Sequence, residues 1–168
     1  MPSDPIVIAA VAAGVGCGAV IDLRTRRVPN ALTITVAAAG LGGAAFGITG
    51  LNIATSVAGL ALGLLLMLPG HIIGATGAGD VKLFAAVGAL IGPMPIGTAF
   101  LYTALAGGVL ALIVATKRRR LRETLDGTAR LVATSAANAA QIESPRANNR
   151  FAYAPAIAVG TLLAALGL

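Results

Sequence analysis

Two aspartates stand out as residues that could perform chemistry in this chain. Of the six acidic residues, four lie in a terminal segment or a polar stretch, whereas Asp22 and Asp80 lie at the edges of apolar stretches. A carboxyl group at the edge of a hydrocarbon layer is costly in free energy, so such residues are candidates for a functional site and are expected to have a partner. We therefore predict that Asp22 and Asp80 form a pair.

A pair of carboxyl groups could hydrolyse a peptide bond. Two carboxyls in close proximity resist double ionisation and tend to share one proton near neutral pH. The ionised member can take a proton from the attacking water, and the protonated member can donate to the carbonyl oxygen. The helix dipoles favour charge on Asp80, at a helix N-terminus, and the proton on Asp22, near a C-terminus. This reaction requires no metal and no other cofactor.

The composition is that of a membrane protein. The 168 residues are 57% hydrophobic and 11% charged, and the mean hydropathy is +0.90. Uncharged apolar stretches predict an all-α polytopic protein with about six transmembrane helices, in a single domain covering residues 1–168. The predicted bounds are Pro5–Leu23, Ala31–Ile48, Ile53–Ile73, Val81–Gly92, Ile96–Thr116 and Phe151–Leu168.

The fourth of these stretches is too short to cross a bilayer. About 12 residues at ~1.5 Å each extend only roughly 18 Å, against a hydrocarbon layer of ~30 Å. The sequence Gly92-Pro93-Met94-Pro95 then breaks the helix. We expect this helix to end inside the membrane or to start earlier than its apolar stretch.

The basic residues predict the orientation of the helices. All 12 Lys and Arg residues fall in or beside the connections after the first, third and fifth apolar stretches. By the positive-inside rule these connections are cytoplasmic, and both termini lie outside. Asp22 ends the first stretch and Asp80 precedes the fourth, so both carboxyls are expected at similar depth near the cytoplasmic face. Nucleic acid is not an expected partner, because the basic run Lys117–Arg120 abuts a membrane span and lacks interleaved aromatics.

A polar segment follows the fifth apolar stretch, at about residues 117–150. Within it, apolar residues fall near one face of a helix and charged residues on the other. This pattern predicts an amphipathic helix on the cytoplasmic surface.

The residues beside the two aspartates differ in how strongly they indicate a functional site. Gly77 and Gly79 precede Asp80 where glycine would let the backbone bend tightly and let another segment approach. Lys82 and Arg24 each lie two residues beyond an aspartate, so either could adjust its pKa or contact a substrate, and Lys82 could instead hold a phosphate headgroup. Anchoring at the membrane interface explains Lys82 equally well, and Arg24 is interpreted first as a determinant of topology. Taken alone, Asp22 is as consistent with such an anchor as with catalysis.

Three segments resemble motifs of the type IV prepilin peptidases. The run Gly77-Ala78-Gly79-Asp80-Val81-Lys82 resembles their Gly-x-Gly-Asp-x-Lys element, and Asp22–Asn30 resembles their first-aspartate segment, Asp-x-Arg followed by Val-Pro-Asn. Tyr153-Ala154-Pro155 resembles the stretch that opens the last helix in the short, tight-adherence type. There, Ala152 and Ala154 replace the Pro and Gly of that family. The resemblance spans nearly the whole chain.

The resemblance implies an aspartyl peptidase of the bacterial inner membrane, with Asp22 and Asp80 as catalytic residues. Its substrate would be a pilin-like precursor, whose basic leader is cut on the cytoplasmic side after a glycine. Longer relatives carry an added cytoplasmic region with paired cysteines and methylate the new N-terminus. Here the first stretch begins almost at Met1 and Cys17 is the single cysteine, so methyl transfer is not expected.

Two other functions stay open at the level of sequence. In a small transporter component, Asp22 and Asp80 would relay protons or bind a cation, although a transport site is expected near the bilayer midplane. In a noncatalytic scaffold of a secretion machine, the polar segment would be a docking surface and neither aspartate would matter for processing.

Overall fold

The computed structural model describes residues 4–117 and 153–167 of the chain. All regular structure in these residues is helical. The helices are α1 (Pro5–Thr25), α2 (Asn30–Ala45), α3 (Ile53–Ile72), α4 (Ala78–Ile91), α5 (Pro93–Lys117) and α7 (Ala154–Ala165). The predicted all-α fold is confirmed, whereas the amphipathic helix predicted at about 117–150 lies outside the described residues.

Three of the helices are long and apolar enough to cross a membrane. They are Pro5–Thr25, Ile53–Ile72 and the part of α5 from Pro93 to Ile113. Helices α2 and α7 are apolar but shorter, with 16 and 12 residues. The chain therefore has the helices of a membrane protein, and the number of six membrane-crossing helices stays a prediction.

Helix α4 starts earlier than its apolar stretch, which was one of the two expectations for this short segment. It begins at Ala78 rather than Val81 and therefore includes Asp80 in its first turn. The predicted break after it is present: Gly92 has a φ of 81°, a backbone conformation that favours glycine, and Pro93 begins α5. At 14 residues, α4 extends about 21 Å.

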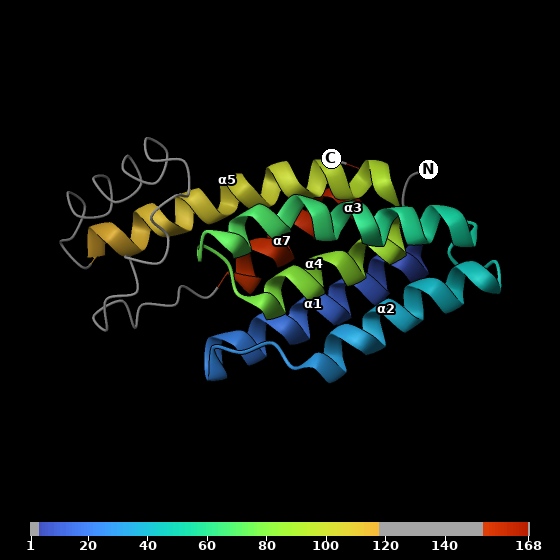
Figure 1. Ribbon diagram of the computed structural model, residues 1–168, viewed down its shortest axis with the longest axis horizontal. Helices are drawn as coiled ribbons and strands as arrows, with labels where there is room; N and C mark the ends of the chain where they lie inside the picture. The colour runs from blue at the N-terminus through green and yellow to red at the C-terminus, as the bar shows by residue number, and fades with distance from the viewer. Residues whose placement is uncertain (1–3, 118–152, 168) are drawn as a thin grey trace.

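Helix α4 lies at the centre of the bundle. Figure 1 shows it between α3 on one side and α1 and α2 on the other. It packs against each of the other helices in the described residues, and every residue from Leu83 to Ile91 is buried. Because protein rather than lipid surrounds α4, its length need not match the thickness of the bilayer.

Small residues let the neighbouring helices approach α4 closely. Gly59 of α3 and Gly88 of α4 face each other, and the backbone carbonyl of each occupies the place where a side chain of the other would lie. The hydroxyl of Ser56 donates to the Ala89 carbonyl at 2.7 Å. Gly40 of α2 packs on the backbone of the same Ala89. Close approach through small residues, with polar bonds between helices, is typical of helix packing in membranes.

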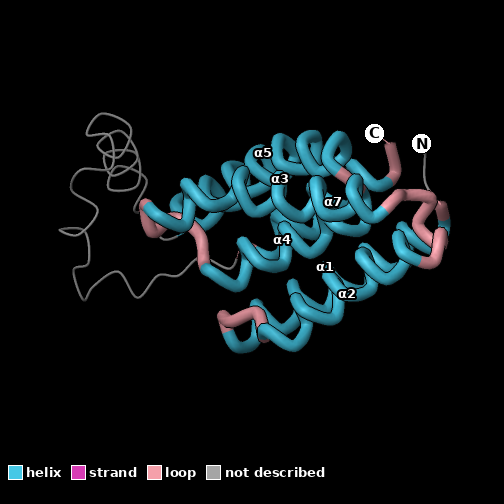
Figure 2. Tube along the Cα trace, turned by 45° about the vertical axis from the view of Figure 1, so that its right-hand side comes forward, coloured by secondary structure: helices cyan, strands magenta, loops and turns pink. Residues whose placement is uncertain are grey.

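The two aspartates lie at the same end of the bundle. Helix α1 begins and α7 ends at the opposite end, where Asp4 and Ala165 line a common pocket (Figure 1). Figure 2 shows the α1–α2 and α3–α4 loops together at the aspartate end and the α2–α3 loop at the other. Asp22 near the end of α1 and Asp80 at the start of α4 are therefore brought to one level by the antiparallel course of the chain.

Candidate active site

Asp22 is held where α1 ends and α7 begins. Its side chain is only 5% exposed, and Oδ2 accepts a hydrogen bond from the backbone N–H of Ala154 at 3.4 Å. Its carbonyl accepts a bond of 2.7 Å from the N–H of Arg26, which ends the helix in the left-handed conformation with a φ of 53°. The carboxylate therefore faces α7 inside the bundle.

Asp80 is the third residue of α4 and is 7% exposed. Its Oδ2 accepts a hydrogen bond from the N–H of Gly77 at 3.3 Å, which caps the start of the helix. Its Oδ1 is buried and has no hydrogen-bond partner among the described residues. Buried polar atoms are nearly always paired, so an oxygen without a partner in this part of the chain marks a candidate position for a bound molecule.

The structure brings the Asp22 and Asp80 carboxylates within electrostatic reach of each other. Their helices, α1 and α4, pack together, and both side chains are buried at the same end. Asp4, the remaining acidic residue in the described ranges, instead accepts a bond from the N–H of Ile6 at the opposite end. The two acidic residues that were predicted to form a pair are thus the two that the fold places together.

The start of α7 contacts Asp22 and lies near Asp80. The N–H of Ala154 donates to Asp22, and the Tyr153 hydroxyl lies within electrostatic reach of the Asp80 carboxylate. The ring of Tyr153 packs on Gly107 of α5, where an added Cβ would lie 2.6 Å from ring carbon Cε2. The residue types of this turn do not by themselves predict a role in the site. The available signal was a tyrosine before an apolar helix, in a segment that resembles a family motif.

The α1–α2 loop packs on the first turn of α4. A Cβ on Gly79 would lie 2.9 Å from the Cβ of Val28 and 3.1 Å from its carbonyl oxygen, so a side chain would displace the loop. One turn further, Lys82 Nζ donates to Asn30 Oδ1 at 3.0 Å. The segments that carry the two aspartate motifs are therefore in direct contact.

Gly77 has a different surrounding from Gly79. Its φ is −74°, which any residue can adopt, so the turn itself does not require glycine. A Cβ on Gly77 would lie 3.1 Å from Asp80 Oδ2, and its own N–H donates to that oxygen. Gly77 therefore allows the carboxylate to fold back closely over the start of its own helix.

The two basic residues predicted to assist the aspartates are both exposed. Lys82 bonds to Asn30, and Arg24 lies in the last turn of α1. Arg26 lies within electrostatic reach of the Asp22 carboxylate, a neighbour that the spacing of the sequence did not single out. A contribution of Lys82 or Arg24 to a substrate contact or to an aspartate pKa stays a prediction.

Residues 9–112 match the model of the type IV leader peptidase family, which covers more than half of the chain. The chain belongs to the type IV leader peptidase family. Both aspartates and the Gly77–Lys82 segment of this leader peptidase lie inside the matched range, whereas the start of α7 lies beyond it. The comparisons with curated proteins and with solved structures gave no match. Membership identifies the protein as a peptidase and agrees with the resemblance seen in its motifs.

Proposed function

We propose that this leader peptidase is an intramembrane aspartyl endopeptidase that uses Asp22 and Asp80. The observation that carries the proposal is a pair of buried carboxylates, from α1 and α4, within electrostatic reach of each other. Oδ1 of Asp80 supports it, because this acceptor has no hydrogen-bond partner in residues 4–117 and 153–167 and can bind water or a substrate group.

The proposed reaction is the attack of water on a peptide carbonyl. One aspartate, ionised, removes a proton from the water as its oxygen bonds to the carbonyl carbon. The other, protonated, donates its proton to the carbonyl oxygen, which gives a tetrahedral intermediate. The C–N bond then breaks, a proton passes to the leaving amine, and the pair returns to its singly protonated state.

The proposed substrate is a pilin-like precursor whose basic leader is cut at the cytoplasmic face of the bacterial inner membrane. Membership of a leader peptidase family supports this substrate class. Arg24, Arg26 and Arg27 follow Asp22 at the aspartate end, which the positive-inside rule assigns to the cytoplasm. Both termini would then lie outside. A precursor anchored by a hydrophobic helix would present its leader junction at the depth of the two carboxylates.

Co-expression with a pilin-like precursor tests the proposal, with the mass of the precursor as the readout. The wild-type chain is expected to shorten the precursor, and Asp22→Asn and Asp80→Asn are each expected to leave it intact, because an amide cannot exchange the required proton. Asp4→Asn is the matched control. Its residue caps α1 at the opposite end, and Asn is an equally good N-cap, so this variant should cleave like the wild type.

Each result has a distinct meaning. An intact precursor with the wild-type chain would contradict cleavage of this substrate class. Cleavage by both single Asn variants would refute the paired mechanism and leave family membership untouched. Proton flux into sealed vesicles containing the wild-type chain and no peptide would favour the transporter instead.

A further inference from the structure

A groove lies between α2 and α3, with α4 as its floor. Figure 1 shows α2 and α3 joined at one end of the bundle and diverging on either side of α4 toward the other. The groove has a volume of about 340 Å³. Its lining residues are Asn30, Thr33, Ile34, Ala37, Leu60, Leu64, Lys82, Ala85 and Ala86. Neither aspartate is among them, because residues two apart on a helix, such as Asp80 and Lys82, do not share a face.

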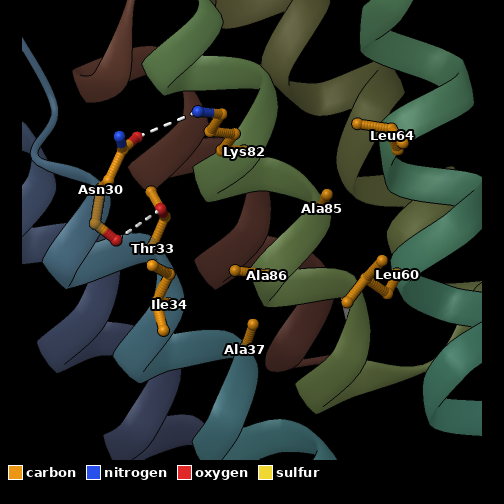
Figure 3. Close-up of a pocket in the computed structure, with 9 residues that line it drawn as sticks. All are labelled: Asn30, Thr33, Ile34, Ala37, Leu60, Leu64, Lys82, Ala85 and Ala86. Carbon is orange, nitrogen blue, oxygen red and sulfur yellow. Dashed lines mark hydrogen bonds between the residues drawn. The ribbon is translucent and has the colours of Figure 1, made fainter.

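The lining of the groove is polar at one side and apolar elsewhere. Figure 3 shows Asn30, Thr33 and Lys82 close together, with Ala37 and Leu60 further along the groove. The small side chains of Ala85 and Ala86, on α4, leave space between α2 and α3. A polar end followed by an apolar channel matches the shape and chemistry of an amphiphile.

Lys82 carries donors beyond those that the protein uses. Its ammonium has three N–H groups, and the hydrogen bond to Asn30 Oδ1 at 3.0 Å uses one of them. The Thr33 hydroxyl already donates to the Asn30 carbonyl at 3.0 Å and does not compete for this ammonium. Within the described ranges, two donors and the positive charge of Lys82 are therefore available at the exposed polar end of the groove.

We propose that the groove binds an anionic phospholipid, with the phosphate at Lys82 and one acyl chain along Ile34, Leu60 and Leu64. Charge decides between the possible occupants. A cation at the polar end attracts a lipid phosphate and repels the basic leader of the proposed substrate. Basic pockets between membrane helices on the cytoplasmic side are suited to anionic headgroups. This site is separate from the aspartates, and the inference does not depend on the proposed cleavage reaction.

Tryptophan fluorescence can test the site, because the chain contains no tryptophan of its own. Leu64→Trp places a fluorophore on the wall of the groove, and Leu105→Trp places one on the exposed face of α5 as a matched control. Each variant is reconstituted in vesicles of phosphatidylcholine and phosphatidylglycerol, in which only one of the two lipids carries bromine on its acyl chains. Bromine quenches tryptophan on contact.

At equal mole fractions of brominated lipid, position 64 should be quenched more by phosphatidylglycerol than by phosphatidylcholine. The expected local enrichment is about fivefold, the effect of one cation near the membrane surface. Position 105 should show no preference. Lys82→Gln in the Leu64→Trp chain should abolish the preference, and Lys82→Arg should retain it.

Equal quenching of position 64 by both lipids would overturn the proposal. So would a preference that persists in the Lys82→Gln chain, since the headgroup would then be bound elsewhere. A photoreactive residue in place of Ile34 identifies the occupant directly, because crosslinking to a pilin-like precursor instead of lipid would assign the groove to the substrate helix.

Discussion

At the residue scale, the two aspartates share one feature of their surroundings. Each accepts a backbone N–H at Oδ2, from Ala154 for Asp22 and from Gly77 for Asp80. A backbone donor fixes the direction of a carboxylate without adding a full opposite charge of its own. The backbone therefore orients both carboxylates, which the proposed proton exchange with a substrate requires.

Tyr153→Phe tests whether the start of α7 contributes more than packing. The substitution keeps the ring against Gly107 and removes the hydroxyl near Asp80. We expect the cleavage rate of a pilin-like precursor to fall by up to about tenfold, because the electrostatic interaction of the hydroxyl with the Asp80 carboxylate is lost and a factor of ten corresponds to about 1.4 kcal/mol of barrier. Tyr102→Phe makes the same change at the other tyrosine of the chain, on α5, and should cleave normally. Equal rates for the two variants would restrict Tyr153 to a packing role.

At the scale of elements, the position of α4 determines whether the aspartates can meet. Helix α4 is buried on nearly all sides and packs through glycine against α3. Its first turn also touches the α1–α2 loop through Gly79 and Val28, and Lys82 bonds to Asn30 of α2. The loop thus connects the end of the helix carrying Asp22 to the start of the helix carrying Asp80.

Gly79→Ala should disturb this connection. The added Cβ would lie 2.9 Å from Val28 Cβ, and the backbone carbonyl at 3.1 Å cannot rotate away as a side chain can. We expect a loss of stability of about 1–3 kcal/mol, the usual effect of overpacking, and a cleavage rate at least tenfold lower. Thermal unfolding in detergent and precursor cleavage would measure the two effects.

Gly16→Ala is the matched control for this substitution. Gly16 is also a helical glycine, in the middle of the helix that carries Asp22, but its added Cβ would meet nothing within 4 Å. Alanine is the better helix former, so Tm should be unchanged or slightly higher and cleavage should be normal. A Gly79→Ala chain that behaves like the Gly16→Ala chain would contradict a role for the loop contact in placing Asp80.

At the scale of the whole molecule, the bundle has two different ends. The aspartate end carries Arg24, Arg26, Arg27 and Lys82, and the opposite end carries Asp4. An asymmetric distribution of basic residues orients a membrane protein, so this difference predicts which end faces the cytoplasm.

Single cysteines can test that orientation in a Cys17→Ala chain. Phe46, 83% exposed, lies at the α2–α3 loop, and Ala75 is exposed in the α3–α4 loop. In intact cells freed of their outer membrane, a membrane-impermeant maleimide should label Phe46→Cys. It should label Ala75→Cys only after lysis. The reverse pattern would place the aspartates on the outer face and contradict cleavage on the cytoplasmic side.

The sequence alone determined the all-helical membrane class, the family and the candidate pair of aspartates. These signals are local: hydropathy over one helix, a glycine motif around Asp80, and a run of arginines after Asp22. The short apolar stretch raised an early start of α4 as one of two possibilities. Only the structure decided between them, because Ala78 and Asp80 lie outside that stretch and join the helix through the cap at Gly77.

Only the tertiary structure decided which residues surround the pair. Ala154 meets Asp22 across 132 positions of the chain, and Lys82 meets Asn30 across 52. No periodicity within one helix encodes such contacts, because they depend on how helices cross and on where glycine lets them approach. The groove beside Lys82 has the same origin, since it exists only because α2 and α3 diverge over α4.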